Sequence, residues 1–218
     1  MPTAITIPIS MFELAIAYRK PEPRLLADRA STIQALFDAF ALWNPRLDDM
    51  EIITAGRHSE QGAKIRLSEH GASFFFGALG CKFTQENATW DQAATMKDLV
   101  TIALNTLGAS TGVTFGTKTS IVSRHLQPET GSFKDILRNL IVPGIQNLAT
   151  EPTIAMAIVA KWPKRRITLD GSAALANAIF LQTEREFDTA ISLEQIQQVL
   201  WDERQELFAL LGVEEVQA

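Results

Sequence analysis

A basic segment that surrounds a tryptophan is the clearest candidate for contact with a negatively charged partner. Four of the six residues in Lys161–Arg166 are positively charged. Cations beside an aromatic ring are typical of loops that hold phosphates or stack on bases. The alternative is a hairpin turn, because Pro163 cannot donate to a strand ladder and cations protect an exposed edge strand. We favour the turn and keep contact with an acidic partner as the alternative. The residues that would make this contact are Trp162, Lys164, Arg165 and Arg166.

A long segment rich in threonine, Thr111–Leu126, carries two further candidate cations. Strand alternation places Lys118 and Arg124 on one face of this segment, together with Thr114 and Ser120. One interpretation is the solvated face of an antiparallel strand, which is common in open sheets. In the other, Lys118 and Arg124 line a concave surface that meets an anionic ligand or an acidic partner.

The last helical segment contributes one aromatic candidate. Leucine and isoleucine recur at helical spacing from Leu193 to Leu211 and predict a buried stripe. Trp201 lies beside this stripe. If Trp201 faces solvent, it is a candidate anchor for a partner or for a second copy, because tryptophan dominates many interfaces.

The residues that could do catalytic or metal chemistry are isolated. His58, His70 and His125 stand alone, and no two histidines have the spacing of a helix-borne metal site. Ser123 and His125 share one strand face, but such neighbours rarely align for proton transfer, and no G-x-S-x-G turn accompanies them. We therefore name no catalytic residue, no metal ligand and no cofactor.

Three other local features have simple structural explanations. The acidic group within Asp48–Glu51 lacks the calcium-binding pattern, so we expect a solvated loop. Gly77 and Gly80 do not form a phosphate-binding loop, and glycines inside a strand mark a bulge or the close approach of another element. Cys81 is expected to be a buried and inert thiol.

The composition limits the classes of partner. The chain has 218 residues, with 20 lysines and arginines against 25 aspartates and glutamates, and a formal net charge of −5. This acidic excess argues against broad binding to nucleic acids and to an anionic membrane surface. A single cysteine excludes an intrachain disulfide. We see no signal peptide and no long uncharged apolar stretch, and we therefore expect a cytoplasmic protein without a membrane span.

Hydrophobic periodicity predicts an alternation of strands and helices along the chain. The expected strands are Phe12–Arg19, Glu51–Ala55, Ala63–Leu67, Ser73–Gln85, Thr111–Leu126, Thr153–Lys161, Arg165–Leu169 and Ala174–Glu184. The expected helices are Pro23–Trp43, Thr89–Gly108, a short one that begins at Ser132 and ends before Pro143, and Ser192–Gly212. Thr89 with Gln92, and Ser192 with Gln195, have the spacing of capping boxes.

The order of these elements indicates an internal duplication. Residues 1–109 and residues 110–218 each read as a strand, a helix, three strands and a helix, with similar spacing from cap to terminal glycine. We therefore predict an α+β protein in which two such halves form one compact pseudo-twofold domain. Its antiparallel sheet or sheets would be covered by helices on one face.

Two classes of function are compatible with this pattern. The first is a non-enzymatic protein-binding or assembly protein of the cytoplasm, which would use an open sheet face or edge to meet another protein or a second copy of itself. The alternative is a small-molecule binding protein or an enzyme, with a pocket under a curved sheet between the aromatic strand Phe74–Phe83 and the polar strand Thr111–Leu126. The residues themselves favour a protein that is not an enzyme.

Overall fold

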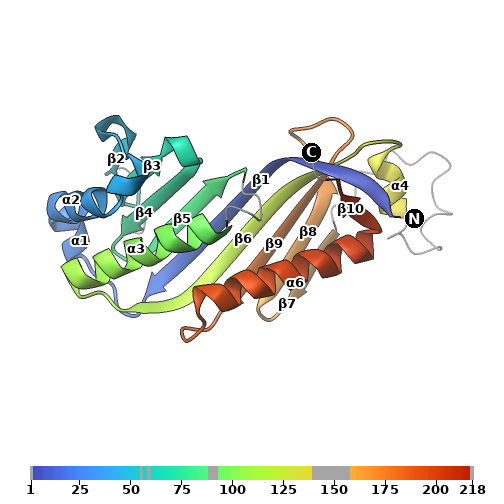
Figure 1. Cartoon of the computed structure of the whole chain (residues 1–218). Helices are drawn as coiled ribbons and strands as arrows, with labels where there is room; N and C mark the ends of the chain where they lie inside the picture. The colour runs from blue at the N-terminus through green and yellow to red at the C-terminus, as the bar shows by residue number, and fades with distance from the viewer. Residues whose placement is uncertain (1, 55, 58–59, 88–92, 139–157, 217–218) are drawn as a thin grey trace. The chain divides into compact units, whose positions relative to one another are not determined.

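The computed structural model describes residues 2–54, 56–57, 60–87, 93–138 and 158–216, and the chain has an α+β fold with one open sheet (Figure 1). The ten strands of this sheet are β1 (Thr3–Tyr18), β2 (Met50–Ile53), β3 (Gly62–Leu67), β4 (Ala72–Gly77), β5 (Gly80–Glu86), β6 (Phe115–Pro128), β7 (Ile158–Trp162), β8 (Arg165–Gly171), β9 (Ile179–Phe187) and β10 (Val213–Glu215). The α-helices are α1 (Arg24–Ala27), α2 (Arg29–Ala39), α3 (Ala93–Thr111), α4 (Phe133–Arg138) and α6 (Leu193–Leu211).

The strands follow the order β2-β3-β4-β5-β1-β6-β9-β8-β7, and β10 pairs with β1 outside this path. The expected antiparallel sheet is therefore confirmed, with one parallel exception. That exception is β10, which pairs with β1 from Thr3↔Val213 to Ile5↔Glu215. The residues that follow α6 thus form a strand in the sheet.

The described chain divides into two compact units. Unit 1 contains Met1–Ser10, Val122–Glu184 and Glu194–Ala218, and unit 2 contains Met11–Ile121 and Arg185–Leu193. The halves expected from the sequence, 1–109 and 110–218, stay a prediction.

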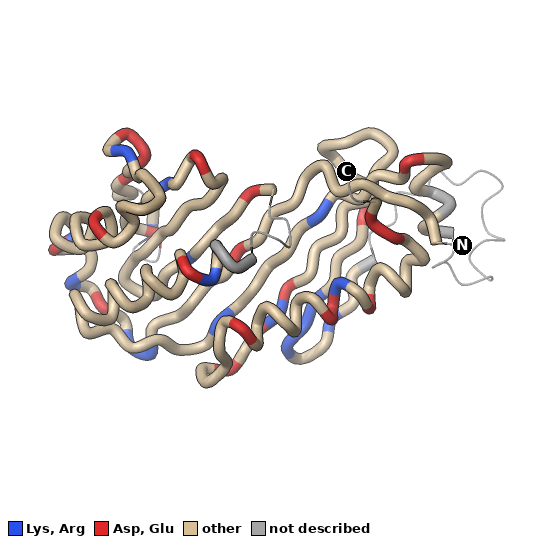
Figure 2. The backbone as a smooth tube through the Cα atoms, in the orientation of Figure 1, with Lys and Arg blue, Asp and Glu red and all other residues tan. Residues whose placement is uncertain are grey.

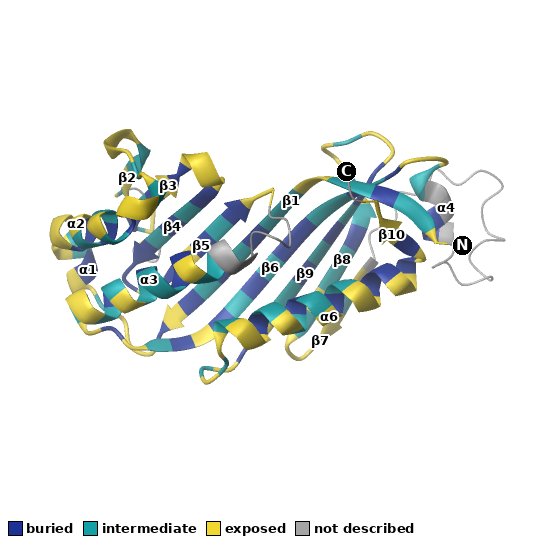
Figure 3. Cartoon of the chain, in the orientation of Figure 1, coloured by how far each residue is buried: buried dark blue, intermediate teal, exposed yellow. Residues whose placement is uncertain are grey.

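Unit 2 has an aromatic core under α2 and α3. The expected strand Phe12–Arg19 lies within β1, and its alternating residues Phe12, Leu14, Ile16 and Tyr18 are all buried. Helix α2 packs on α3 and on β3. Further buried rings come from the C-cap of α2 and from β4 and β5, and they are Phe40, Phe74, Phe76 and Phe83. Figure 3 shows the alternation of buried and less buried positions along these strands.

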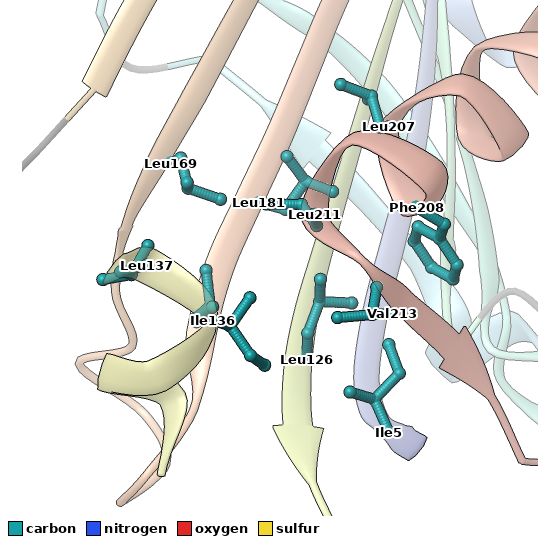
Figure 4. Packing of buried hydrophobic residues seen from close by; sticks show 11 residues of the cluster. Ile5, Leu126, Ile136, Leu137, Leu169, Leu181, Leu207, Phe208, Leu211 and Val213 are labelled. Carbon is teal, nitrogen blue, oxygen red and sulfur yellow. The ribbon is translucent and has the colours of Figure 1, made fainter. Parts of the chain in front are cut away.

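Unit 1 has a core of branched aliphatic side chains under α6. Figure 4 shows Leu207 and Leu211 of α6 in one cluster with Leu126 of β6 and Leu181 of β9. Val213 of β10 joins the same cluster. The stripe that helical spacing predicted in the last helix is therefore confirmed as core.

The expected long strand Ser73–Gln85 is wrong, because this segment is a hairpin of β4 and β5. The buried positions change from even numbers, at Phe74 and Phe76, to odd numbers, at Cys81 and Phe83. A single strand cannot shift its inner face in this way, so the change of parity marks the turn.

At both glycines of this hairpin a neighbouring strand approaches closely, which is one of the two alternatives that the sequence left open. A Cβ atom on Gly80 would lie 2.5 Å from the carbonyl oxygen of Ile16, and one on Gly77 would lie 2.6 Å from that of Gln61. The strands on either side therefore approach too closely to admit a larger residue.

Helix ends differ from the expectations in two places. Helix α3 runs past Gly108 to Thr111 and ends before Gly112, whose φ of +71° lies in the left-handed region that glycine favours. The segment Pro23–Trp43 contains α1, α2 and a 3₁₀ turn rather than one helix. The capping box of Thr89 and Gln92, residues 139–142 of the expected short helix, and residues 153–157 of the expected strand lie outside the described residues.

Candidate functional site

The basic segment is the turn of a β-hairpin, as the sequence predicted. Strands β7 and β8 pair in antiparallel register from Ile158↔Leu169 to Trp162↔Arg165. Pro163 and Lys164 form the two-residue turn between them. Proline fixes φ near the value that the first turn position requires. Among the described strands, β7 is the last of the sheet order and has β8 as its neighbour.

One cation of this hairpin ties it to helix α6. The Arg165 Nε atom lies 2.5 Å from Oε1 of Glu203, and an Nη atom donates to Oε2 of Glu206 at 3.1 Å. The carboxylate of Glu203 is buried, with 4% of the residue exposed. Arg165 shares its strand face with Ile167 and Leu169, which pack toward the same helix. Arg165 therefore supports the hairpin from within the protein.

The other positions of the hairpin lie at its surface. Lys161, Lys164 and Arg166 are exposed, and the Nη1 atom of Arg166 lies 4.0 Å from Oε2 of Glu184. Figure 2 shows the blue hairpin beside the red and blue turns of α6. The cations expected to act together thus differ in role, because Arg165 is engaged with α6 and the others face outward.

Trp162 is held in place but stays half exposed. The guanidinium carbon of Arg165 lies 5.4 Å from the centroid of the Trp162 ring, a cation–π distance. Nevertheless 49% of Trp162 is exposed, and Val159 on the other face of β7 is 52% exposed. A fixed strand with two large apolar side chains at its surface is an unusual feature for a sheet edge.

Lys118 and Arg124 both interact with other groups of the same chain. Lys118 is 7% exposed, and its ammonium donates to the carbonyl oxygen of Thr189 at 2.9 Å. Ser120, on the same face, is fully buried. The interpretation of this strand face as solvated is therefore wrong. Burial lowers the pKa of Lys118, because it disfavours the charged form.

Arg124 faces charges from α6 and β10. Burial lowers the pKa of Arg124 to about 10, and the neighbouring Arg204 contributes in the same direction. Glu215 and Glu203 oppose this shift because they stabilise the cation. Arg124 therefore remains charged at neutral pH, and the charge of Glu203, which lies beside Arg165, is one of the two that stabilise it.

Glu203 is the residue of this network that sequence reasoning missed. It lies at the stripe position three residues after Leu200 and four before Leu207, both of which are buried. A carboxylate on a buried helix stripe requires a cationic partner. This rule would have pointed to an ion pair between α6 and the sheet.

Trp201 is partly buried against its own helix. The guanidinium of Arg204 lies 5.3 Å from the Trp201 ring centroid and 4.3 Å from that of Phe208. Arg204 also pairs with Glu215 of β10. Trp201 is thus packed beside an ion pair, and its use as a partner anchor stays a prediction.

His125 pairs with a serine other than the neighbour considered from the sequence. Its Nδ1 atom lies 2.8 Å from Oγ of Ser172, whereas Ser123 Oγ accepts from Gln182 at 3.2 Å. The Ser172 oxygen accepts from the backbone N–H groups of residues 174 and 175, so we assign its own proton to His125. This pair fastens a turn to β6, and its two members are too distant in sequence for spacing to reveal it.

Known proteins offer no family assignment for this chain. No family model and no curated protein matches this sequence. Within the described residues, no group of three or more histidine, cysteine, aspartate or glutamate side chains could hold a metal ion. The helices in that part of the chain also include none that is long and apolar enough to cross a membrane.

Proposed function

We propose that this chain is a non-enzymatic protein-binding or assembly protein that acts through the edge strand β7. The observation that carries the proposal is the exposure of Val159 and Trp162, 52% and 49%, on the last described strand of the sheet order. An exposed apolar strand edge is a template for an added strand, with main-chain hydrogen bonds for affinity and side chains for selectivity. The cations beside it select an acidic partner.

The main chain of β7 offers hydrogen-bonding groups for such a strand. In a two-residue hairpin, the closing pair Trp162↔Arg165 exchanges main-chain hydrogen bonds, and bonded pairs alternate along the ladder. The main-chain groups of Val159 and Lys161 therefore point away from β8. These groups would pair with the partner strand.

The support beneath the hairpin favours binding. The two ion pairs of Arg165 with α6 and its contact with the Trp162 ring hold β7 before any partner arrives. A strand that is already ordered loses less conformational entropy when it binds. The alternative, a ligand pocket lined by Lys118 and Arg124, has less support, because these cations already face Thr189 and two glutamates.

We also propose that the fold arose by the internal duplication that the sequence suggested. In the sheet order, β1 is followed outward by β5, β4, β3 and β2, and β6 is followed outward by β9, β8 and β7. In both series, the first strand pairs with the last strand before a long helix, α3 or α6. Under this proposal, β2 and β7 are equivalent edges of two related halves.

Binding of a synthetic peptide with alternating valine and glutamate, measured by fluorescence anisotropy, tests the function of β7. We expect the full chain to bind the peptide and Val159→Pro to bind it at least about tenfold more weakly, because proline removes an outward N–H donor. Leu210→Ala is the control, because Leu210 is an exposed leucine of α6. Equal binding by Val159→Pro, or no binding by the full chain, would overturn the proposal.

A further inference from the structure

Resting on the proposed function of β7, we propose that its partner is a second copy of this chain, which docks the edge strand β2 against β7. Strand β2 is the first strand of the described sheet order, and it pairs with β3 from Met50↔Ile65 to Ile53↔Gly62. The two strands that end the order thus each offer an edge.

The β2 edge has the same unusual surface as the β7 edge. Ile52 within the strand is 58% exposed, and Leu47 in the preceding 3₁₀ turn is 77% exposed. The strands are also similar in length, with four residues in β2 and five in β7. Pairing of the two edges would cover exposed apolar side chains on both copies.

The charges of the two edges are opposite. Leu47–Ile53 contains three acidic residues and no cation, whereas Ile158–Arg166 contains four cations and no acid. Part of each charge is compensated within the chain, since Arg66 pairs with Glu51 and Arg165 pairs with α6. Asp48 and Lys161 are exposed, and we expect these two charges to meet across the contact.

The same charges disfavour symmetric pairing. Two β7 strands would bring lysines and arginines together, and two β2 strands would bring carboxylates together. Cations on an edge strand therefore prevent β7 from pairing with itself and still permit pairing with an acidic edge. The contact that remains is heterologous, and such contacts build closed rings or open chains of copies.

A mixing experiment with two blocked variants separates this contact from every symmetric one. Variant A carries Val159→Pro, which blocks β7. Variant B carries Asp48→Lys and Ile52→Lys, which place cations on β2. We expect the unmodified chain to associate in sedimentation velocity as its concentration rises. Variants A and B are each monomeric, and their equimolar mixture forms a dimer, because A retains β2 and B retains β7.

The outcomes distinguish failure of this inference from failure of the proposed function. Self-association of B alone, or an A–B mixture that stays monomeric, overturns the pairing of β2 with β7. If the acidic peptide still binds B and not A, the function of β7 survives that result. If the peptide binds neither the unmodified chain nor B, the proposed function of β7 fails as well.

Further measurements test whether the A–B dimer forms through the strand edges. Lys161→Glu is a second way to block β7 without proline, and it should replace variant A in the mixture if Val159→Pro does not fold. Added salt should weaken the A–B dimer, because it screens exposed charges. A dimer that forms equally well with Asp48→Lys and Ile52→Lys on both chains would contradict the proposed contact.

Discussion

The two units cover their parts of the sheet in different ways, although each places helices on one face. In unit 2, the covered face combines aliphatic side chains with buried aromatic rings, and Phe40 and Phe74 are in edge contact at 6.2 Å. In unit 1, the covered face combines aliphatic side chains with the charges of Arg124, Arg165 and Glu203. An apolar face gains stability with each buried atom, whereas a buried ion pair repays its desolvation only when its geometry is good.

This difference indicates what each region contributes to the molecule. The apolar face of unit 2 contributes stability through burial, and each ring can pack against any apolar neighbour. The ionic face of unit 1 fixes one hairpin in one place, because Arg165 forms an ion pair with Glu203 and donates a hydrogen bond to Glu206. The edge strand proposed to bind a partner is attached to the more specific of the two faces.

The largest effect should come from removing a ring of unit 2. Phe74→Ala should lower the free energy of unfolding by about 4 kcal/mol, because it removes a fully buried ring and leaves a cavity. Phe75→Ala is the matched control, since Phe75 is the next residue of β4 and lies on the opposite, less buried face. It should cost about 1 kcal/mol. Urea unfolding measures both values. Equal losses of unfolding free energy would show that burial on the covered face does not contribute more to stability than the opposite face.

Loss of a charge in unit 1 should have the next largest effect. Glu203→Ala should lower the free energy of unfolding by about 3 kcal/mol, because it removes the buried ion-pair partner of Arg165 and one of the two charges that stabilise Arg124 as a cation. The variant should also loosen β7, which hydrogen exchange of the hairpin amides can measure.

A double variant distinguishes the ion pair from simple packing. Glu203→Leu with Arg165→Leu should recover most of the loss, because two apolar side chains of similar volume carry no desolvation cost. If the two changes are instead additive, the pair contributes packing rather than charge, and the contrast between the units would disappear.

The fold was largely accessible from periodicity, and the buried charges were not. The alternation from Phe12 to Tyr18 and the stripe of the last helix gave correct inner faces, because the hydrophobic effect depends on each residue's own character. The shift of apolar positions from even numbers, up to Phe76, to odd numbers, from Cys81, also indicates the β4–β5 turn. The continuous run of phenylalanines made this shift hard to recognise.

The candidate site was predictable only in part, because its contacts join distant residues. Pro163 gave the hairpin turn from local chemistry. The partners of Arg165 and His125, which are Glu203 and Ser172, lie 38 and 47 residues away along the chain. Spacing along the chain does not identify contact partners at such separations. Glu203 is an exception in one respect, because a charged residue on an apolar helix stripe indicates that a buried partner exists.

At neutral pH the smallest expected effect concerns Cys81, which reports on the apolar face of unit 2. Burial raises the pKa of the Cys81 thiol from 9.0 to about 12, so the folded thiol stays neutral at pH values where the unfolded thiol ionises. The unfolded state then binds fewer protons than the folded state, and the free energy of unfolding falls as pH rises from 9 toward 12. The slope should reach about 1.4 kcal/mol per pH unit for this one group. Urea unfolding of Cys81→Ala should lack this contribution, and identical pH profiles would show that the thiol is solvated in the folded protein.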